Sequence, residues 1–167
     1  EKVTFDPQKT QYVIFLFNPK ARFRDGSAVT AQDVKFSFDA YQTKSNPGLQ
    51  MYLADLDKTE VLSKYMVKMS FKSDKNSEMP LILSQMPIYS KKDWQHKDFT
   101  RVTLQPILGS GPYLIDRIDA GRSITYKLNP NYWGKDLAVN KGRYNFARLK
   151  YVYYRSLDIA FEGFKSG

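Results

Sequence analysis

The sequence predicts an α+β fold, in which helices and antiparallel β-hairpins are mixed along one chain. Three observations support this prediction. Strand-length segments outnumber helical ones, two pairs of strands are separated by short turns, and one amphipathic helix lies between the first strand and the first hairpin. Strands joined by a short turn pair in opposite directions, so the sheets are expected to be largely antiparallel.

The first strand is expected over residues 12–17. This segment, Tyr-Val-Ile-Phe-Leu-Phe, is the longest apolar run of the chain and has the length of a buried strand. Asn18-Pro19 then predicts a turn, and Asp25-Gly26 predicts a second one.

A helix is expected at about residues 31–42. Thr30 can cap its first amides, and Asp33 takes the place that glutamate usually holds in a capping box. The residues 45–48, Ser-Asn-Pro-Gly, are expected to end the helix. The apolar side chains that recur at helical spacing are Val34, Phe38 and Tyr41.

Two hairpins are expected further along the chain. Residues 57–72 form the first, because Tyr65, Val67, Met69 and Phe71 alternate with Met66, Lys68, Ser70 and Lys72, the period of a half-buried strand. Residues 113–129 form the second, with residues 119–122 as its turn. The remaining expected elements are a short helix around 80–86, one helical turn at 91–94, a strand over 147–154 and a last helix through 164.

The composition excludes several kinds of site. The 167 residues include no cysteine and one histidine, His96, so the chain can form no disulfide, no cysteine metal site and no two-histidine zinc site of its own. We therefore expect neither a metal nor another cofactor. The net charge of +9 points to nucleic acid or an anionic membrane as a partner class. An aromatic content of 15% argues against a disordered chain.

No catalytic constellation emerges, and we do not expect an enzyme. His96 lies in a polar segment and is interpreted as a surface histidine, although a triad assembled in space stays open at this point. Residues 109–112, Gly-Ser-Gly-Pro, lack the ending of a phosphate-binding loop and precede a strand, so they are interpreted as a tight turn. Two carboxylate pairs are interpreted as solvated: Asp55 with Asp57, and Asp74 with Glu78.

The stretch from residue 132 to residue 155 has two interpretations. Its lysine and arginine residues interleave with tyrosine and tryptophan, which is the best argument in this sequence for binding single-stranded nucleic acid. The aromatic residues also fit strand alternation, so packing in a core explains them better.

Three blocks in a fixed order resemble one family. They are residues 23–34, residues 108–113 and residues 129–134. Together they resemble the extracellular solute-binding proteins of the peptide and nickel class, family 5, which serve ABC importers. The segment 133–146 is similar to an insert of the YejA-like branch, which is associated with oligopeptide uptake. The residues that carry the motifs are Asp25, Gly26, Thr30, Asp33, Gly109, Gly111, Pro112, Tyr113, Tyr132 and Trp133.

The resemblance implies an architecture and a function. The fold would be part of lobe I of a two-lobed periplasmic binding protein, with residues 1–95 as the smaller subdomain and residues 96–167 as part of the larger one. The ligand would be an oligopeptide and the partner a membrane permease, with the protein periplasmic, monomeric and without a nucleic-acid partner. The motif residues would define the fold more than the ligand.

One residue is a candidate for ligand contact, and both ends of the chain carry an expectation. Tyr52 lies at about the place where relatives bring a tyrosine to the cleft, and the alternative is that it packs within its subdomain. The chain opens on Glu1 without methionine and closes on Gly167 directly after a helical pattern. We therefore expect it to be a piece of a longer protein, too small a part of the cleft to bind ligand well alone.

Overall fold

The computed structural model describes residues 2–4, 11–74, 76–101 and 103–166, with side chains from residue 11 onward. The chain divides into two compact units. Unit 1 comprises Glu1–Val102 with Leu108–Ser110, and unit 2 comprises Thr103–Ile107 with Gly111–Gly167. The expected assignment of residues 1–95 and 96–167 to subdomains of a larger lobe stays a prediction.

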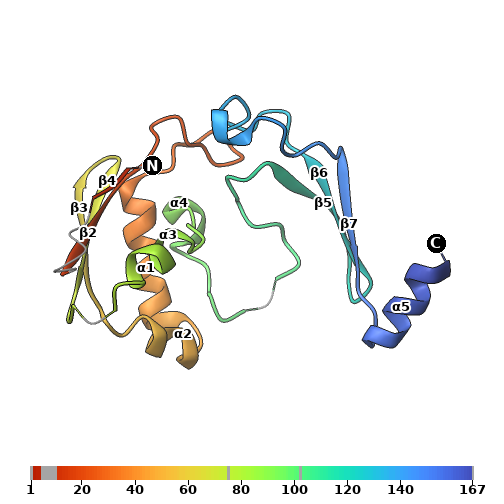
Figure 1. Ribbon diagram of the computed structural model, residues 1–167, viewed down its shortest axis with the longest axis horizontal. Coiled ribbons are helices and arrows are strands. Elements are labelled where there is room, and N and C mark those ends of the chain that lie inside the picture. Colours follow the sequence, from red (N-terminus) through yellow and green to blue (C-terminus); the bar gives the residue numbers. More distant parts are fainter. Residues whose placement is uncertain (1, 5–10, 75, 102, 167) are drawn as a thin grey trace. The chain divides into compact units, whose positions relative to one another are not determined.

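Unit 1 is built on a four-stranded antiparallel sheet with the strand order β1-β2-β4-β3 (Figure 1). The expected first hairpin is confirmed as β3 and β4, which pair with Thr59 opposite Met69 and Val61 opposite Val67. The central pair of the sheet is β2 and β4, in which Val13 lies opposite Met69. The strands are β1 (Lys2–Thr4), β2 (Tyr12–Leu16), β3 (Leu56–Ser63) and β4 (Met66–Phe71).

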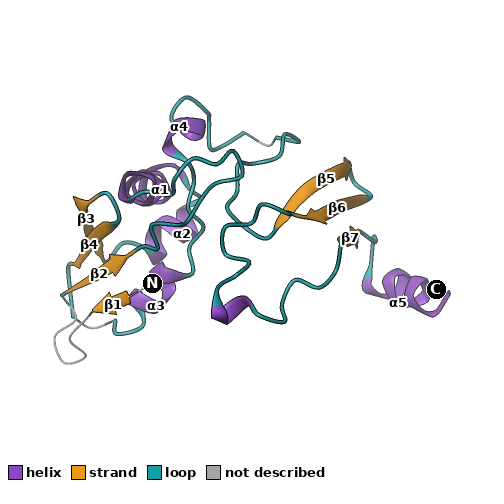
Figure 2. Ribbon diagram, turned by 90° about the horizontal axis from the view of Figure 1, so that it is seen from above, coloured by secondary structure: helices purple, strands orange, loops and turns teal. Residues whose placement is uncertain are grey.

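The helices of unit 1 lie on one face of this sheet (Figure 2). They are α1 (Ala31–Lys44), α2 (Pro47–Tyr52), α3 (Met79–Ser84) and α4 (Lys91–Trp94). The expected break after α1 is confirmed, but it also starts a helix. Pro47 suits the first turn of α2, and the side chain of Asn46 accepts a hydrogen bond from the amide of Leu49 at 3.0 Å.

The strand β2 is buried on one face only. Val13 and Phe15 point into the core, whereas Tyr12 and Leu16 are 45% and 40% exposed. The expectation of a buried strand was right for the face under α1. It was wrong for the outer face, because none of the described helices covers that side of the sheet.

The core of unit 1 lies between α1 and the inner face of the sheet. Phe38, on the predicted apolar face of α1, is 1% exposed, and its ring meets that of Tyr41 edge to face at 5.9 Å. The same cluster includes residues of all three long strands, of α3 and of the position after α2: Val13, Phe15, Leu53, Leu56, Val67, Met69, Phe71, Met79 and Leu83.

Unit 2 contains a three-stranded antiparallel sheet with the order β5-β6-β7. The expected second hairpin is confirmed, and Gly121 supplies the positive φ, +73°, that its turn requires. The elements are β5 (Tyr113–Asp119), β6 (Ser123–Leu128), the short 3₁₀ turn η1 (Ala138–Asn140), β7 (Arg148–Val152) and α5 (Leu157–Ser166).

Three late tyrosines do not lie in a core of this chain. Tyr151, Tyr153 and Tyr154 are 56%, 54% and 47% exposed, and none of the described residues of α5 is buried. Core packing was the favoured interpretation for these residues, and it was wrong within this chain. The physical reason is that, among the described residues of unit 2, no second layer covers the three-stranded sheet at these positions.

None of the helices in the described part of the chain combines the length and the apolar character that crossing a membrane requires.

Candidate functional site

Asp33, from the first predicted motif, joins the start of α1 to a distant segment. Its Oδ2 atom accepts hydrogen bonds from the backbone amide of Thr30 at 2.9 Å and from the Thr30 hydroxyl at 2.6 Å. Its Oδ1 atom accepts from the backbone amide of Lys91 at 2.8 Å. The capping box predicted from the sequence is therefore present, and the same carboxylate also holds the residue that begins α4.

Two further side chains of α1 continue this link. Ser37 accepts from the backbone amide of Tyr89 at 2.8 Å, and the hydroxyl of Tyr41 donates to the carbonyl of Pro87 at 2.8 Å. Together with Asp33 they form what we call the α1 ladder, three side chains one helical turn apart that bind every second residue of the segment 87–91. Alternate residues of an extended backbone face the same side, which explains the spacing.

The Tyr41 phenol gives the ladder a dependence on alkaline pH. Burial raises the pKa of Tyr41 well above its ordinary value, and the neighbouring Tyr89 adds to the shift. A raised pKa means that the folded state keeps a proton that the unfolded state releases, so this stabilisation is complete below about pH 10 and declines as the pH rises further. We expect the unfolding free energy to fall above about pH 10, and Tyr41→Phe to make that fall shallower. Urea unfolding between neutral and alkaline pH measures this, and an unchanged slope in the variant would contradict it.

The first two family motifs lie against each other in unit 1. Asp25 accepts hydrogen bonds from the amide and the hydroxyl of Ser27 at 2.9 and 2.5 Å, and these bonds lower the pKa of the Asp25 carboxyl. Gly26 has a φ of +83°, so the predicted Asp-Gly turn is confirmed. The next contact is between motifs, because the amide of Arg24 donates to the carbonyl of Gly109 at 2.8 Å.

The second and third motifs meet in unit 2. The amide of Asn129 donates to the carbonyl of Pro112 at 2.7 Å, next to the pairing of Tyr113 with Leu128. The second motif is thus divided between the two units, with Gly109 in unit 1 and Gly111 in unit 2.

The insert that follows the third motif folds back on it. The ring of Tyr144 contacts those of Tyr113 and Tyr132, with centroids 6.2 and 5.9 Å apart. Burial, and then the nearby Tyr144, raises the pKa of Tyr132. Gly134 leaves room for this packing, because a Cβ atom there would lie 2.7 Å from the Tyr132 hydroxyl. Tyr132 and Trp133 are half-buried, and their rings meet edge to face at 5.7 Å.

The structure does not bring the other predicted candidates together. Tyr52 is the last residue of α2 and is 51% exposed. His96 is exposed, and no hydrogen bond joins it to a serine or a carboxylate among the described residues. Asp55 accepts a hydrogen bond from Ser73 at 3.0 Å. Over the described residues no group of three or more histidine, aspartate or glutamate side chains could hold a metal ion.

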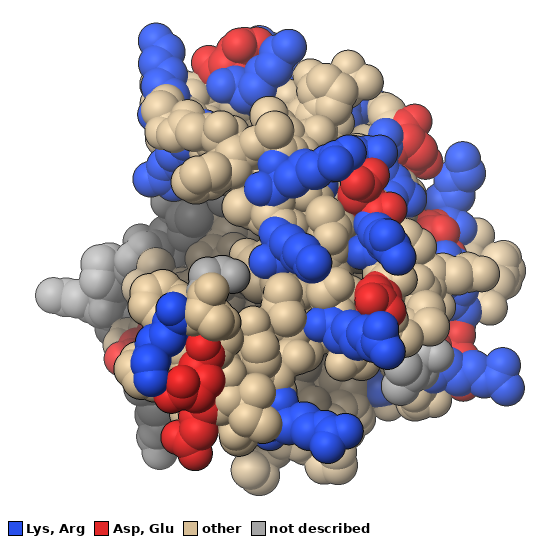
Figure 3. Space-filling view, turned by 90° about the vertical axis from the view of Figure 1, so that its right-hand side faces the viewer, with Lys and Arg blue, Asp and Glu red and all other residues tan. Residues whose placement is uncertain are grey.

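Charged side chains of unit 2 are mixed rather than gathered by sign. Figure 3 shows lysine and arginine side chains spread over one face with acidic side chains between them. In the β5-β6-β7 sheet, Asp116 forms ion pairs with Lys127 at 3.0 Å and with Arg148 at 3.7 Å, and its hydrogen bond with Lys127 lowers the pKa of Asp116. On the face that Figure 3 shows, the described basic residues are therefore interrupted by acidic ones, unlike the continuous basic groove that single-strand binding uses.

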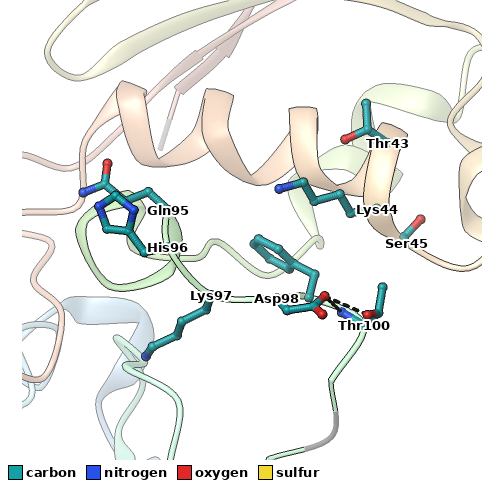
Figure 4. Close-up of a pocket in the computed structure, with 9 residues that line it drawn as sticks. Thr43, Lys44, Ser45, Gln95, His96, Lys97, Asp98 and Thr100 are labelled. Carbon is teal, nitrogen blue, oxygen red and sulfur yellow. Dashed lines mark hydrogen bonds between the residues drawn. The ribbon is translucent and has the colours of Figure 1, made fainter.

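Two adjoining hollows in unit 1 were not predicted from the sequence. They lie where α1 ends, and their volumes are about 630 and 450 Å³. Figure 4 shows the first, with Thr43 and Lys44 in the last turn of α1, Ser45 directly after it, and Gln95, His96, Lys97, Asp98 and Thr100 on the segment opposite. Their walls come from two segments that are far apart in the sequence, about residues 40–49 and 89–100, so no local sequence pattern could predict them. The residues that line the second are Ala40, Tyr41, Lys44, Ser45, Asn46, Leu49, Tyr89, Phe99 and Thr100.

Comparison with known proteins gives a consistent result over the whole chain. Residues 4–167 match the family described as bacterial extracellular solute-binding proteins, family 5 middle. The chain is 36% identical over 168 residues to the probable peptide-binding protein YejA of Agrobacterium fabrum, covering 96% of this chain and 27% of that protein. It is 34% identical over 168 residues to the peptidoglycan-binding protein YepA of the same organism, covering 100% of this chain and 27% of that protein.

Solved structures show the same fold. NikZ from Campylobacter jejuni in complex with Ni(L-His) superposes with a TM-score of 0.82 at 20% identity, over 99% of this chain and 32% of that one. The periplasmic oligopeptide-binding protein of Thermotoga maritima, bound to mannohexaose, superposes with a TM-score of 0.78 at 22% identity, over 97% of this chain and 30% of that one. The chain spans 27% of the length of these two curated relatives.

Proposed function

This chain belongs to the bacterial extracellular solute-binding proteins of family 5, and from that premise we propose that it forms part of an oligopeptide receptor for an ABC importer. The receptor acts in the periplasm, as a monomer, and delivers its ligand to a permease in the membrane. It binds and releases without catalysing a reaction, and nucleic acid is not its partner.

The choice of peptide among possible solutes rests on one observation. Over nearly the whole chain the sequence is 36% identical to a protein named as peptide-binding, against 34% for the peptidoglycan-binding relative and 20% for the nickel-complex protein. The named ligands of other relatives are peptidoglycan and mannohexaose, so the family as such does not select a peptide. The resemblance of the insert at 133–146 to the YejA-like branch supports the same choice.

Calorimetric titration of the full-length protein tests this proposal. We expect mixed tripeptides to pentapeptides to bind with a dissociation constant of about 1 μM or tighter. Ni(L-His), mannohexaose and a muropeptide serve as competing ligand classes. Tight binding of one of these three without peptide binding would replace the proposed substrate. The 167-residue chain alone, about a quarter of its relatives in length, is expected not to reach micromolar affinity.

The same titration examines Tyr52. It is half-exposed at the end of a short helix, where a phenol ring is free to meet a ligand. We expect Tyr52→Ala in the full-length protein to weaken peptide binding by about tenfold, the loss of one aromatic contact. Met51→Ala is a matched control, because Met51 is the exposed neighbour on the same helix. Unchanged affinity together with unchanged stability would remove Tyr52 from the ligand site.

A further inference from the structure

We propose that the two adjoining hollows at the end of α1 form one groove, the α1 groove, that binds a small carboxylate with an apolar body. The groove is a second ligand site in unit 1, because Tyr52 lines neither hollow. The inference goes beyond peptide binding and does not depend on it.

The two hollows share part of their lining. Lys44, Ser45, Phe99 and Thr100 line both of them, so a molecule in one touches the wall of the other. Volumes of about 630 and 450 Å³ lie within the range of sites for small ligands.

One end of the groove is apolar and held in place. Tyr41, Leu49, Tyr89 and Phe99 line this end. The ring of Phe99 packs against Tyr89 at 5.4 Å and against the buried Trp94 at 4.7 Å. The α1 ladder fixes the Tyr41 hydroxyl and the Tyr89 backbone, so this end needs no rearrangement to receive an aryl or alkyl group.

The charge of the groove selects an anion at Lys44. The Lys44 ammonium lies 5.7 Å from the centre of the Phe99 ring and forms no ion pair within 4 Å among the described residues, although its charge contributes to lowering the pKa of Asp98. Lys97, in contrast, is already paired with Asp93 at 2.7 Å. Lys44 lines both hollows, which puts its charge where the apolar end meets the polar end.

The single carboxylate of the groove directs the ligand. Asp98 accepts hydrogen bonds from the hydroxyl and the amide of Thr100 at 2.7 and 2.9 Å, and these bonds, followed by the nearby charges of Arg101 and Lys44, lower the pKa of Asp98. Asp98 is therefore ionised at neutral pH and repels an anion from the polar end. A carboxylate is stabilised beside Lys44 with its apolar body toward Leu49 and Tyr89, and not in the reverse orientation.

Intrinsic fluorescence can report on this groove. The chain has two tryptophans, Trp94 in unit 1 and Trp133 in unit 2. In a Trp133→Phe background the signal comes from Trp94 alone, which is 7% exposed and contacts the groove residue Phe99. The probes are 3-phenylpropionate and its uncharged analogue 3-phenylpropanamide, titrated against the full chain.

The expected result is saturable binding of 3-phenylpropionate with a dissociation constant of about 1 mM or tighter, and at least about tenfold weaker binding of the amide. Lys44→Met should weaken the carboxylate by about tenfold without weakening the amide. Lys35→Met is the matched control, since Lys35 is on the same helix but pairs with Asp39 at 2.8 Å and lines neither hollow.

Three results would overturn the proposal: no saturation by about 10 mM, equal binding of the acid and the amide, or equal effects of the two lysine substitutions. Because both lysines are on the surface, circular dichroism is expected to show folded variants in either case. None of these outcomes bears on peptide binding by the full-length protein.

Discussion

Replacing Asp33 by alanine is expected to lower the unfolding free energy of unit 1 by about 3–5 kcal/mol. The Asp33 carboxylate is 6% exposed and accepts three hydrogen bonds, two of them from the backbone amides of Thr30 and Lys91. Alanine would leave both amides without their acceptor in a place with little access to water. A buried amide that has lost its acceptor lowers the unfolding free energy by more than the net contribution of the hydrogen bond, because its desolvation is no longer compensated.

Urea unfolding followed by Trp94 fluorescence in the Trp133→Phe background measures this loss in unit 1. Asp39→Ala is the control on the same helix. It removes an exposed ion pair with Lys35 and should change stability by no more than about 0.5 kcal/mol. Asp33→Asn should fall between the two, because its amide oxygen can still accept while its NH₂ group faces donors. A loss below about 1 kcal/mol for Asp33→Ala would show that the link to Lys91 does not hold unit 1 together.

Replacing Phe38 by alanine is expected to cost about 3–5 kcal/mol of the stability of unit 1. Phe38 is 1% exposed and lies in the cluster between α1 and the sheet. The loss combines the removed apolar area with the cavity that a close-packed core cannot fully close. Since small domains are typically stable by about 5–15 kcal/mol, this change would bring unit 1 near its limit.

The graded control for this prediction is Phe38→Leu, which keeps most of the apolar volume. It should cost less than about half as much as alanine. The same fluorescence-detected unfolding serves as the measurement. If the two variants were equally stable, Phe38 would not be the centre of the core.

The elements that were predictable from the sequence are those with strong local signals. The helix α1 has its cap at Thr30 and an apolar face every three or four residues, and both are properties of neighbouring residues. The hairpins were equally clear, because alternation and turn residues lie within one short window. The family resemblance extended this to the fold, since the three blocks could be recognised in order.

What the sequence could not predict depends on what covers a surface. The apolar residues of β2 look alike on both faces, yet only Val13 and Phe15 meet the helices. The exposed tyrosines of β7 and the residues after it have the same composition as a core strand. In both cases the local pattern states a preference for burial, and only the tertiary packing decides whether a second layer exists. The α1 groove could not be predicted from the sequence for a related reason, because the segments that form its walls are far apart in the chain.

The α1 ladder also depends on a match between the rise of a helix and that of an extended chain. Four residues of a helix advance about 6.0 Å, whereas two residues of an extended chain advance about 6.6 Å. The two spacings therefore differ by about 0.6 Å for each step along the ladder. Over the two intervals of the ladder the mismatch is only about 1.2 Å. Side chains on one face of α1 can therefore reach Lys91, Tyr89 and Pro87 in turn without either segment bending.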